Sequence, residues 1–109
     1  MDAFAALGDP TRRAILDLLL EGECTAGAIG EAFPHLSQPA ISRNLSILRA
    51  AGLVAVRPEA QRRVYALAAS GVADLERWLG PHRQYWIEYF EAQDQAEARA
   101  KGRTRSSPP

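Results

Sequence analysis

The 109-residue sequence predicts a mainly α-helical domain with one small β-hairpin. Three observations support this fold class. Capping residues followed by apolar residues at helical spacing mark several short helices within residues 1–52. Two short β-prone runs on either side of a polar turn follow in residues 53–67. A helical period then returns from residue 70, and the total length suits a single domain.

The first two expected helices occupy the N-terminal 21 residues. A short helix is expected over residues 2–7. Asp9 and Pro10 then combine a capping acid with a proline at the first helical position, which is typical of a helix start. The second helix is expected over residues 11–21, and Gly22 ends it. Its apolar face comprises Ile15, Leu18 and Leu19.

Two further helices separated by a short turn are expected next. Thr25 caps a helix over residues 26–33, and Pro34 blocks its continuation. Ser37 caps the following helix, which Gly52 stops. The buried stripe of this helix lies within about 60° at 100° per residue. It consists of Ile41, Leu45 and Leu48.

The hairpin is expected from two β-prone runs, residues 53–57 and 62–67. The polar residues 58–61 form the connection between them. This connection contains no glycine, and a tight primed turn favours glycine or asparagine because it requires positive φ angles. We therefore expect a loose turn.

The last helical segment is rich in aromatic residues. Five of the eight aromatic residues fall within residues 78–90, on more than one side of the expected helix. Gly80 and Pro81 are expected to kink or break this helix. Residues 98–109 are basic and have no apolar period, so we expect a disordered tail there.

The net charge is zero, but the charges are segregated along the chain. Residues 37–63 carry five arginines and one glutamate, a net charge of +4, whereas residues 1–36 and 64–98 each carry −4. A basic block between acidic segments is typical of a protein that attracts nucleic acid to one face and repels it elsewhere.

A helix, a short turn, a second helix and a basic hairpin together form a winged helix-turn-helix. The second helix of such a motif enters the major groove of double-stranded DNA. Gln38 could pair with adenine there, and Arg43 with guanine or a phosphate. The residues expected to contact DNA are Ser37, Gln38, Pro39, Ser42, Arg43, Asn44, Ser46, Arg49, Arg62 and Arg63. The simpler alternative is that Ser37 is only a cap and the arginines are solvated surface charges.

These stretches resemble the ArsR/SmtB family of bacterial winged-helix repressors, in the metal-independent branch that includes the SdpR-like autorepressors. The resemblance covers residues 3–93. Its motifs are Phe4 to Leu7, Asp9 to Leu16, Thr25 to Gly27, Ser37 to Arg43, Leu45 to Gly52 and Arg62 to Leu67. It implies a homodimer that binds an inverted repeat and represses transcription, with Gln38, Ser42 and Arg43 facing DNA. Asn44 departs from the pattern, since many relatives have histidine there.

No metal site, cofactor or enzymatic activity is expected. A tight transition-metal site needs three or four ligands, and the chain has one cysteine, Cys24. The last helix contains one histidine, His82, with no second histidine at ligand spacing. Two-fold pairing would supply only two ligands of each kind. No phosphate-binding loop, catalytic triad motif or distinctive carboxylate pair is present in the sequence.

The aromatic residues of the last helix exceed what a small winged core can cover, so they predict a dimer interface. The expected interface residues are Phe4, Leu7, Trp78, Leu79, His82, Tyr85, Trp86, Tyr89 and Phe90. Three alternatives stay open. The rings could cover the core of their own chain, they could line a pocket for a small-molecule effector, or the fold could be a protein-interaction module that has lost DNA binding.

Three features favour a cytoplasmic protein without a membrane span. The N-terminus has no signal-peptide pattern, the single cysteine cannot form an internal disulfide, and no apolar run approaches about 20 residues. The expected domain covers residues 1–97, with dimerisation helices at about 1–8 and 70–97, and the basic tail covers 98–109.

Overall fold

The computed structural model describes residues 1–106, and their side chains up to residue 102. The chain divides into two compact units, one comprising Met1–Leu75 and the other beginning at Glu76. We call the first the winged unit and the second the aromatic segment, and describe each by itself. In the described part of the chain, no helix combines the length and the apolar character needed to cross a membrane.

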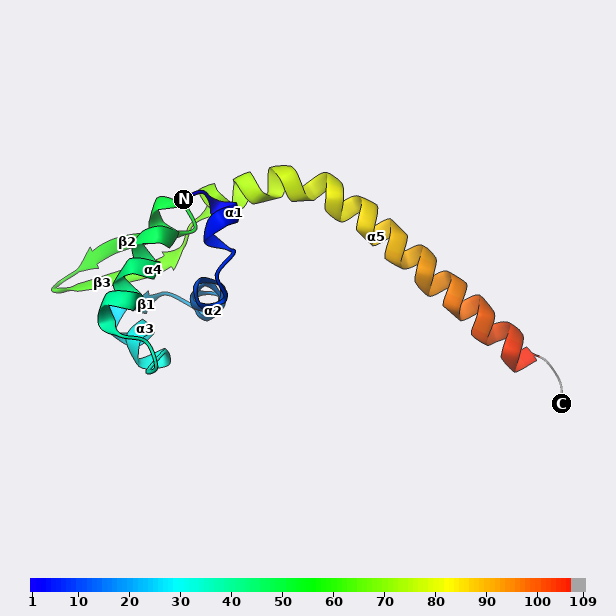
Figure 1. Cartoon of the computed structure of the whole chain (residues 1–109), viewed down its shortest axis with the longest axis horizontal. Helices are drawn as coiled ribbons and strands as arrows, with labels where there is room; N and C mark the ends of the chain where they lie inside the picture. The colour runs from blue at the N-terminus through cyan, green and yellow to red at the C-terminus, as the bar shows by residue number, and fades with distance from the viewer. Residues whose placement is uncertain (107–109) are drawn as a thin grey trace. The chain divides into compact units, whose positions relative to one another are not determined.

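The chain is mostly helical and has one small antiparallel sheet, as the sequence predicts (Figure 1). The sheet has the strand order β1-β3-β2. The elements are α1 (Ala3–Ala6), α2 (Pro10–Leu19), β1 (Cys24–Thr25), α3 (Ala26–Ala32), α4 (Gln38–Ala50), β2 (Val54–Glu59), β3 (Arg62–Leu67) and α5 (Ala69–Ser106).

Polar caps fix the starts of the first four helices. The side-chain oxygens of Asp2, Asp9, Thr25 and Ser37 each accept a hydrogen bond from the backbone N–H three residues further on, over 2.8–3.2 Å. Each bond satisfies one of the N–H groups that a helix leaves unpaired at its first turn. The helix starts at Pro10, Ala26 and Gln38 therefore lie where the sequence predicts them.

One apolar side of each short helix forms the core of the winged unit. The predicted stripe of α4 is confirmed, because Ile41, Leu45 and Leu48 are all buried. From α2, Ile15 and Leu19 are buried, and Ile29 of α3 is fully enclosed. Burial of α4 along this stripe leaves the side chains on its far side, Arg43 among them, exposed.

Strand β1 was not predicted. Its two residues pair with β3, with Cys24 opposite Tyr65 and Thr25 opposite Val64. Two residues are too few to show the alternation that identifies a strand in a sequence. The strand ties the segment before α3 to the hairpin.

The expectation of a loose hairpin turn was wrong. Strands β2 and β3 remain paired up to Glu59 and Arg62, so only Ala60 and Gln61 form the turn. Ala60 takes the positive φ angle of 57° that such a turn needs. For a residue other than glycine this conformation costs about 1–2 kcal/mol. The paired strands on both sides hold it in place. We call β2, β3 and this turn the wing.

The end of α4 and the start of α5 are in close backbone contact at two glycines. Gly52 has a φ of 74°, and its carbonyl accepts a hydrogen bond from the N–H of Gly71 over 2.7 Å. A Cβ atom on Gly71 would lie 2.5 Å from the carbonyl oxygen of Ala51. The sequence identifies Gly52 as a helix terminator but gives no sign that Gly71 meets it.

In the aromatic segment, α5 differs from the sequence prediction in two ways. The sequence predicts a kink or a break at Gly80 and Pro81, and the break is wrong, since α5 continues through both residues. An ion pair between Glu76 and Arg83 spans this site, and the flanking residues favour a helix.

The second difference lies at the C-terminus. Residues 98–106 continue α5 and do not form the expected disordered tail. They contain alanine, arginine and lysine, which are good helix formers, and extending an existing helix needs no new nucleation. The remainder of the expected tail, residues 107–109, lies outside the described residues.

Candidate nucleic-acid interface

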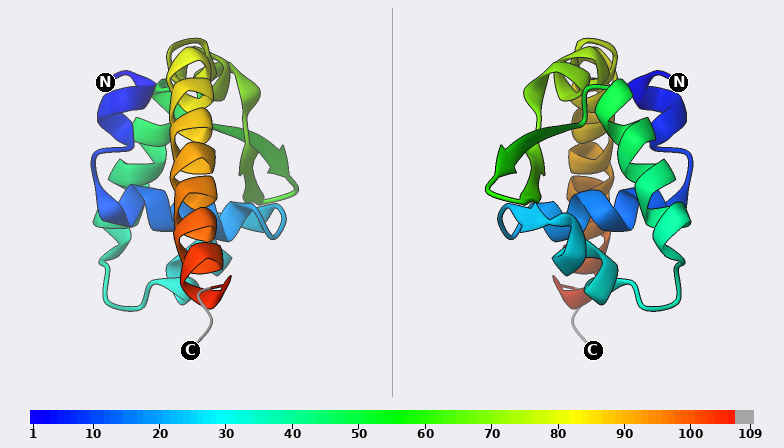
Figure 2. Two further views of the ribbon diagram at one scale, coloured as in Figure 1. Left: turned by 90° about the vertical axis from the view of Figure 1, so that its right-hand side faces the viewer. Right: turned by 90° about the vertical axis from the view of Figure 1, so that its left-hand side faces the viewer.

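Helices α3 and α4 form the helix-turn-helix, joined by residues 33–37. The N–H of Leu36 donates to the carbonyl of Phe33 over 3.0 Å, which closes the turn. Figure 2 shows α1 and the wing on opposite sides of α4. The outward side of α4 is therefore the surface available to a partner within this unit.

The flank of α4 nearest the sheet carries polar side chains along the whole helix. At 100° per residue, Gln38, Ser42 and Arg49 fall within an arc of about 40°, and Ser46 lies about 40° further round. All four side chains are exposed. The two short serines between a long amide and a long guanidinium leave room for a large partner to approach the helix backbone.

A hollow of about 330 Å³ lies beside this flank, between α3 and α4. Gln38 and Ser42 line it on the α4 side, Glu31 on the α3 side, and Tyr65 of β3 also contributes to its lining. Its position shows that the polar flank of α4 borders a concave surface.

Arg43, Pro39 and Ser37 lie at other positions around α4. Arg43 lies roughly opposite the buried stripe and is exposed. Pro39 is exposed in the first turn, where a proline costs no hydrogen bond. The Ser37 hydroxyl oxygen accepts from the N–H of Ala40 over 3.2 Å, so Ser37 serves as a cap while also being exposed.

Among the residues of α4 predicted to contact DNA, Asn44 alone is not exposed. It is half-buried, and its Oδ1 accepts a hydrogen bond from Nη1 of Arg12 over 3.4 Å. Arg12 in turn donates from Nε to the carbonyl of Ala6 over 2.7 Å. Asn44 thus faces the side of α1 and α2, away from the polar flank.

Arg12 and its neighbour have a structural role that the sequence analysis missed. Arg13 donates from Nη1 to the carbonyl of Leu7 over 2.6 Å, so both guanidinium groups satisfy carbonyls at the C-terminal end of α1. The positive charge of an arginine near a helix C-terminus also interacts favourably with the negative end of the helix dipole. Arg12 is therefore a link between α1 and α4. Two arginines directly after a cap and a proline were the only signal in the sequence.

The wing has two faces that differ in charge. Because side chains alternate along a strand, Arg62 and Arg63 point to opposite faces. Arg63 shares its face with its cross-strand partner Pro58. These two residues, with Val56 and with Arg49 of α4, line a hollow of about 230 Å³. The structure thus brings Arg63 of the wing next to Arg49, at the C-terminal end of the polar flank of α4.

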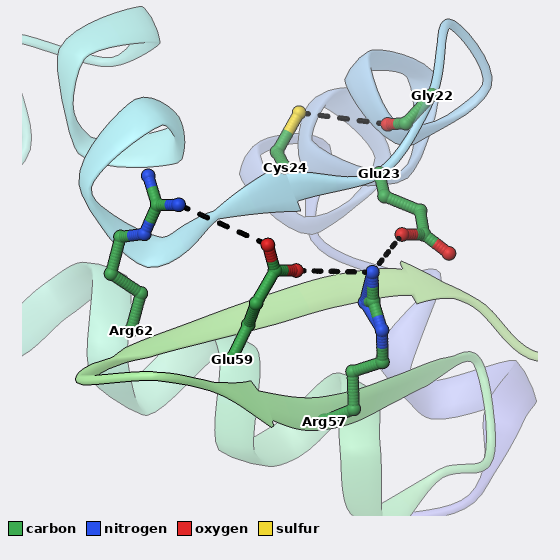
Figure 3. Close-up of polar contacts among 6 residues, drawn as sticks. All are labelled: Gly22, Glu23, Cys24, Arg57, Glu59 and Arg62. Carbon is green, nitrogen blue, oxygen red and sulfur yellow. Dashed lines mark hydrogen bonds and ion pairs between the residues drawn. The ribbon is translucent and has the colours of Figure 1, made fainter.

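The opposite face of the wing carries a chain of ion pairs (Figure 3). Nη2 of Arg57 lies 2.8 Å from Oε2 of Glu23 and 3.2 Å from Oε2 of Glu59. The other carboxylate oxygen of Glu59 lies 3.9 Å from Nη2 of Arg62. Within residues 1–106, no carboxylate pairs in this way with Arg43, Arg49 or Arg63.

In the aromatic segment, the rings predicted for a dimer interface are exposed. Trp78 stacks on His82 with ring centroids 4.1 Å apart. Trp86 contacts Tyr85 and Tyr89 edge-on at 5.0 and 5.5 Å. The exposed fractions of the aromatic residues range from 44% for Tyr89 to 61% for Tyr85. The exposed apolar residues of this segment are Trp78, Leu79, Tyr85, Trp86, Ile87, Tyr89 and Phe90, of which Ile87 was not predicted.

The two interface residues predicted in the winged unit differ in burial. Phe4 of α1 is 46% exposed. Leu7 is half-buried and packs against the core. Phe4 is therefore the more exposed member of this pair.

Cys24 and the histidines do not gather with other candidate ligands. Among the residues that the structure describes, no three histidine, cysteine, aspartate or glutamate side chains are grouped to hold a metal ion. The Cys24 thiol donates to the carbonyl of Gly22 over 3.6 Å.

Comparison with known proteins identifies similar sequences and folds. The family described as "Bacterial regulatory protein, arsR family" matches residues 9–56, from the cap of α2 into β2. The transcriptional repressor SdpR of Bacillus subtilis is 41% identical over 78 residues, which cover 72% of this chain and 86% of SdpR. The regulator Rv2034 of Mycobacterium tuberculosis is 42% identical over 80 residues, covering 70% of this chain and 74% of the relative.

Solved structures show the same architecture. The crystal structure of an ArsR family transcriptional regulator superposes with a TM-score of 0.67 at 27% identity, over 78% of this chain and 87% of that protein. These similar proteins are transcriptional regulators and not enzymes.

Proposed function

We propose, from the premise that this chain belongs to the arsR family of bacterial regulatory proteins, that it represses transcription as a cytoplasmic homodimer bound to an inverted-repeat operator. The observation that carries the proposal is the exposed polar flank of α4 beside Arg63 of the wing. A major groove about 12 Å wide admits one helix, and polar side chains on that helix read the edges of the bases.

The residues of the interface divide into base readers and phosphate contacts. Gln38 lies in the first turn of α4, where a recognition helix meets bases, and its amide matches N6 and N7 of adenine. Arg43 projects outward and reaches a guanine or a phosphate. Arg49 and Arg63 form a shared basic site for one phosphate strand. Asn44 supports α4 through Arg12 and is the weakest candidate for a DNA contact.

The homodimer is supported by exposed apolar side chains on α1 and α5. Phe4 and the rings of the aromatic segment are large apolar groups at the surface, which mark protein interfaces. A two-fold dimer would present two copies of α4 to half-sites about one DNA turn, or about 34 Å, apart.

We also propose that the repressor acts without a metal sensor site. The whole chain contains one cysteine and two histidines. A tight site for a transition metal needs three or four ligands, and in the part of the chain that the structure describes no three histidine, cysteine, aspartate or glutamate side chains lie close enough to share one.

The replacement Arg43→Ala tests the function. If Arg43 reads a base, specific binding weakens by about 1–3 kcal/mol and random DNA is less affected. An equal loss on specific and random DNA would make Arg43 a phosphate contact. Fluorescence anisotropy of labelled duplexes measures both, and Arg99→Ala serves as a control for the loss of one positive charge. The alternative is a protein-interaction module that has lost DNA binding. It would be supported if the unaltered protein bound no duplex at low salt and a protein partner co-purified with it.

A further inference from the structure

We propose that Glu23 and Glu59 act as an electrostatic brake on the wing, withholding Arg57 and Arg62 from the phosphates of bound DNA. The inference rests on the proposed DNA binding and concerns how strongly the wing takes part in it. It assigns Glu23 and Glu59 a role in setting affinity, although neither residue is expected to touch a base.

The four side chains form one continuous chain of charges, visible in Figure 3. Arg57 contacts the carboxylates of both Glu23 and Glu59 through a single nitrogen, at 2.8 and 3.2 Å. Glu59 uses its second oxygen toward Arg62, at 3.9 Å. Two of the three wing arginines are thus already paired in the protein alone.

The tight turn creates this arrangement. Glu59 and Arg62 are direct cross-strand partners because only two residues separate the strands. Arg57 precedes Glu59 by two residues and therefore points to the same face. Glu23 reaches this face from the residue before β1, which pairs with the other edge of β3. A longer turn would not hold Glu59 and Arg62 opposite each other.

The brake is partial because the pairs are exposed. The side chains of the four residues are 51–66% exposed. Ion pairs at such surfaces are weak and screened by salt, so an approaching phosphate can compete with the carboxylates. The carboxylates also repel the phosphate directly. Three arginines and two glutamates leave this part of the protein with a net charge of only +1.

Arg63 is not held by the brake, because neither Glu23 nor Glu59 pairs with it and its side chain lies beside Arg49. The wing is thus divided into a face that is ready for a phosphate and a face whose arginines are already engaged. This division predicts that removing a carboxylate strengthens binding through Arg57 and Arg62 and leaves the contribution of Arg63 unchanged.

The test measures affinity and its salt dependence for Glu59→Gln and Glu23→Gln on one duplex. The matched control is Glu21→Gln, which removes the same charge from an exposed residue outside the ion-pair chain. Glu59→Gln should tighten binding by about two- to fivefold at low salt. It should also steepen the log–log salt slope by about 0.9 for each arginine released. A gain no larger than that of Glu21→Gln would overturn the brake.

A double-mutant cycle separates a brake from simple repulsion. In the Arg57→Ala/Arg62→Ala background, Glu59→Gln should bring only the smaller gain that comes from removing the direct repulsion between the carboxylate and the phosphate. A gain of the same size there would show that the carboxylate acts only on the DNA, and it would overturn the proposal. If the double replacement does not fold, Arg62→Ala alone should reduce the gain.

The same titrations distinguish failure of the inference from failure of the proposed function. If neither the unaltered protein nor Glu59→Gln binds any duplex at low salt, both are overturned. If the unaltered protein binds DNA and Glu59→Gln does not tighten that binding, only the proposal of the brake is overturned.

Discussion

The arginines of helix α4 and of the wing all lie in the basic stretch of residues 37–63, yet the two regions present these charges differently. In α4, the exposed Arg43 and Arg49 have no carboxylate partner among the described residues. In the wing, Arg57 and Arg62 are engaged by Glu23 and Glu59. A net charge counted along a sequence therefore overstates the charge that a bound partner meets. What matters is which arginines have a carboxylate within reach.

The two regions also differ in how they are anchored. Three buried side chains of α4 enter the core, and Leu48 among them is fully enclosed. The wing is anchored near its base by Val54, Val64 and Tyr65, and its turn is exposed. We expect the helix to hold its position when DNA binds and the wing to adapt.

The largest expected effect is on stability. Leu48→Ala should lower the free energy of unfolding by about 2–5 kcal/mol, because it leaves a cavity in a closed core. Val56→Ala in the wing should cost about 1 kcal/mol, since Val56 is only half-buried. Denaturant unfolding of both variants measures the difference. Equal losses would show that the wing is as firmly anchored as α4.

Much of the winged unit could be predicted because its signals are local. The caps Asp9, Thr25 and Ser37 each act within three residues, and the buried stripe of α4 repeats within one helix. Neither requires knowledge of the tertiary fold.

The features that were not predicted depend on residues far apart in the chain. Asn44 meets Arg12 across 32 positions, and Arg57 meets Glu23 only because β1 lies beside β3. The tight turn escaped prediction because the pairing of β2 with β3 imposes a positive φ angle on Ala60. The division of the wing into two faces could be foreseen only once that register was known.

A smaller effect concerns the start of α4. Ser37→Ala should destabilise the protein by about 1 kcal/mol, because the N–H of Ala40 loses its acceptor. Ser46→Ala is the matched control, an exposed serine inside the same helix, and it should change stability by less than about 0.5 kcal/mol. Thermal unfolding of the two variants compares them. Equal effects would indicate that the Ser37 cap contributes nothing beyond helix propensity.

The most direct test of the claim that α4 reads the bases is selection of bound duplexes from a random pool. The unaltered protein should enrich a two-fold symmetric sequence with half-sites about 10 base pairs apart, centre to centre. Gln38→Ala should relax the preference at one position in each half-site, whereas Arg62→Ala should enrich the same sequence. An unenriched pool would contradict the account, as would a preference that survives Gln38→Ala and disappears with Arg62→Ala.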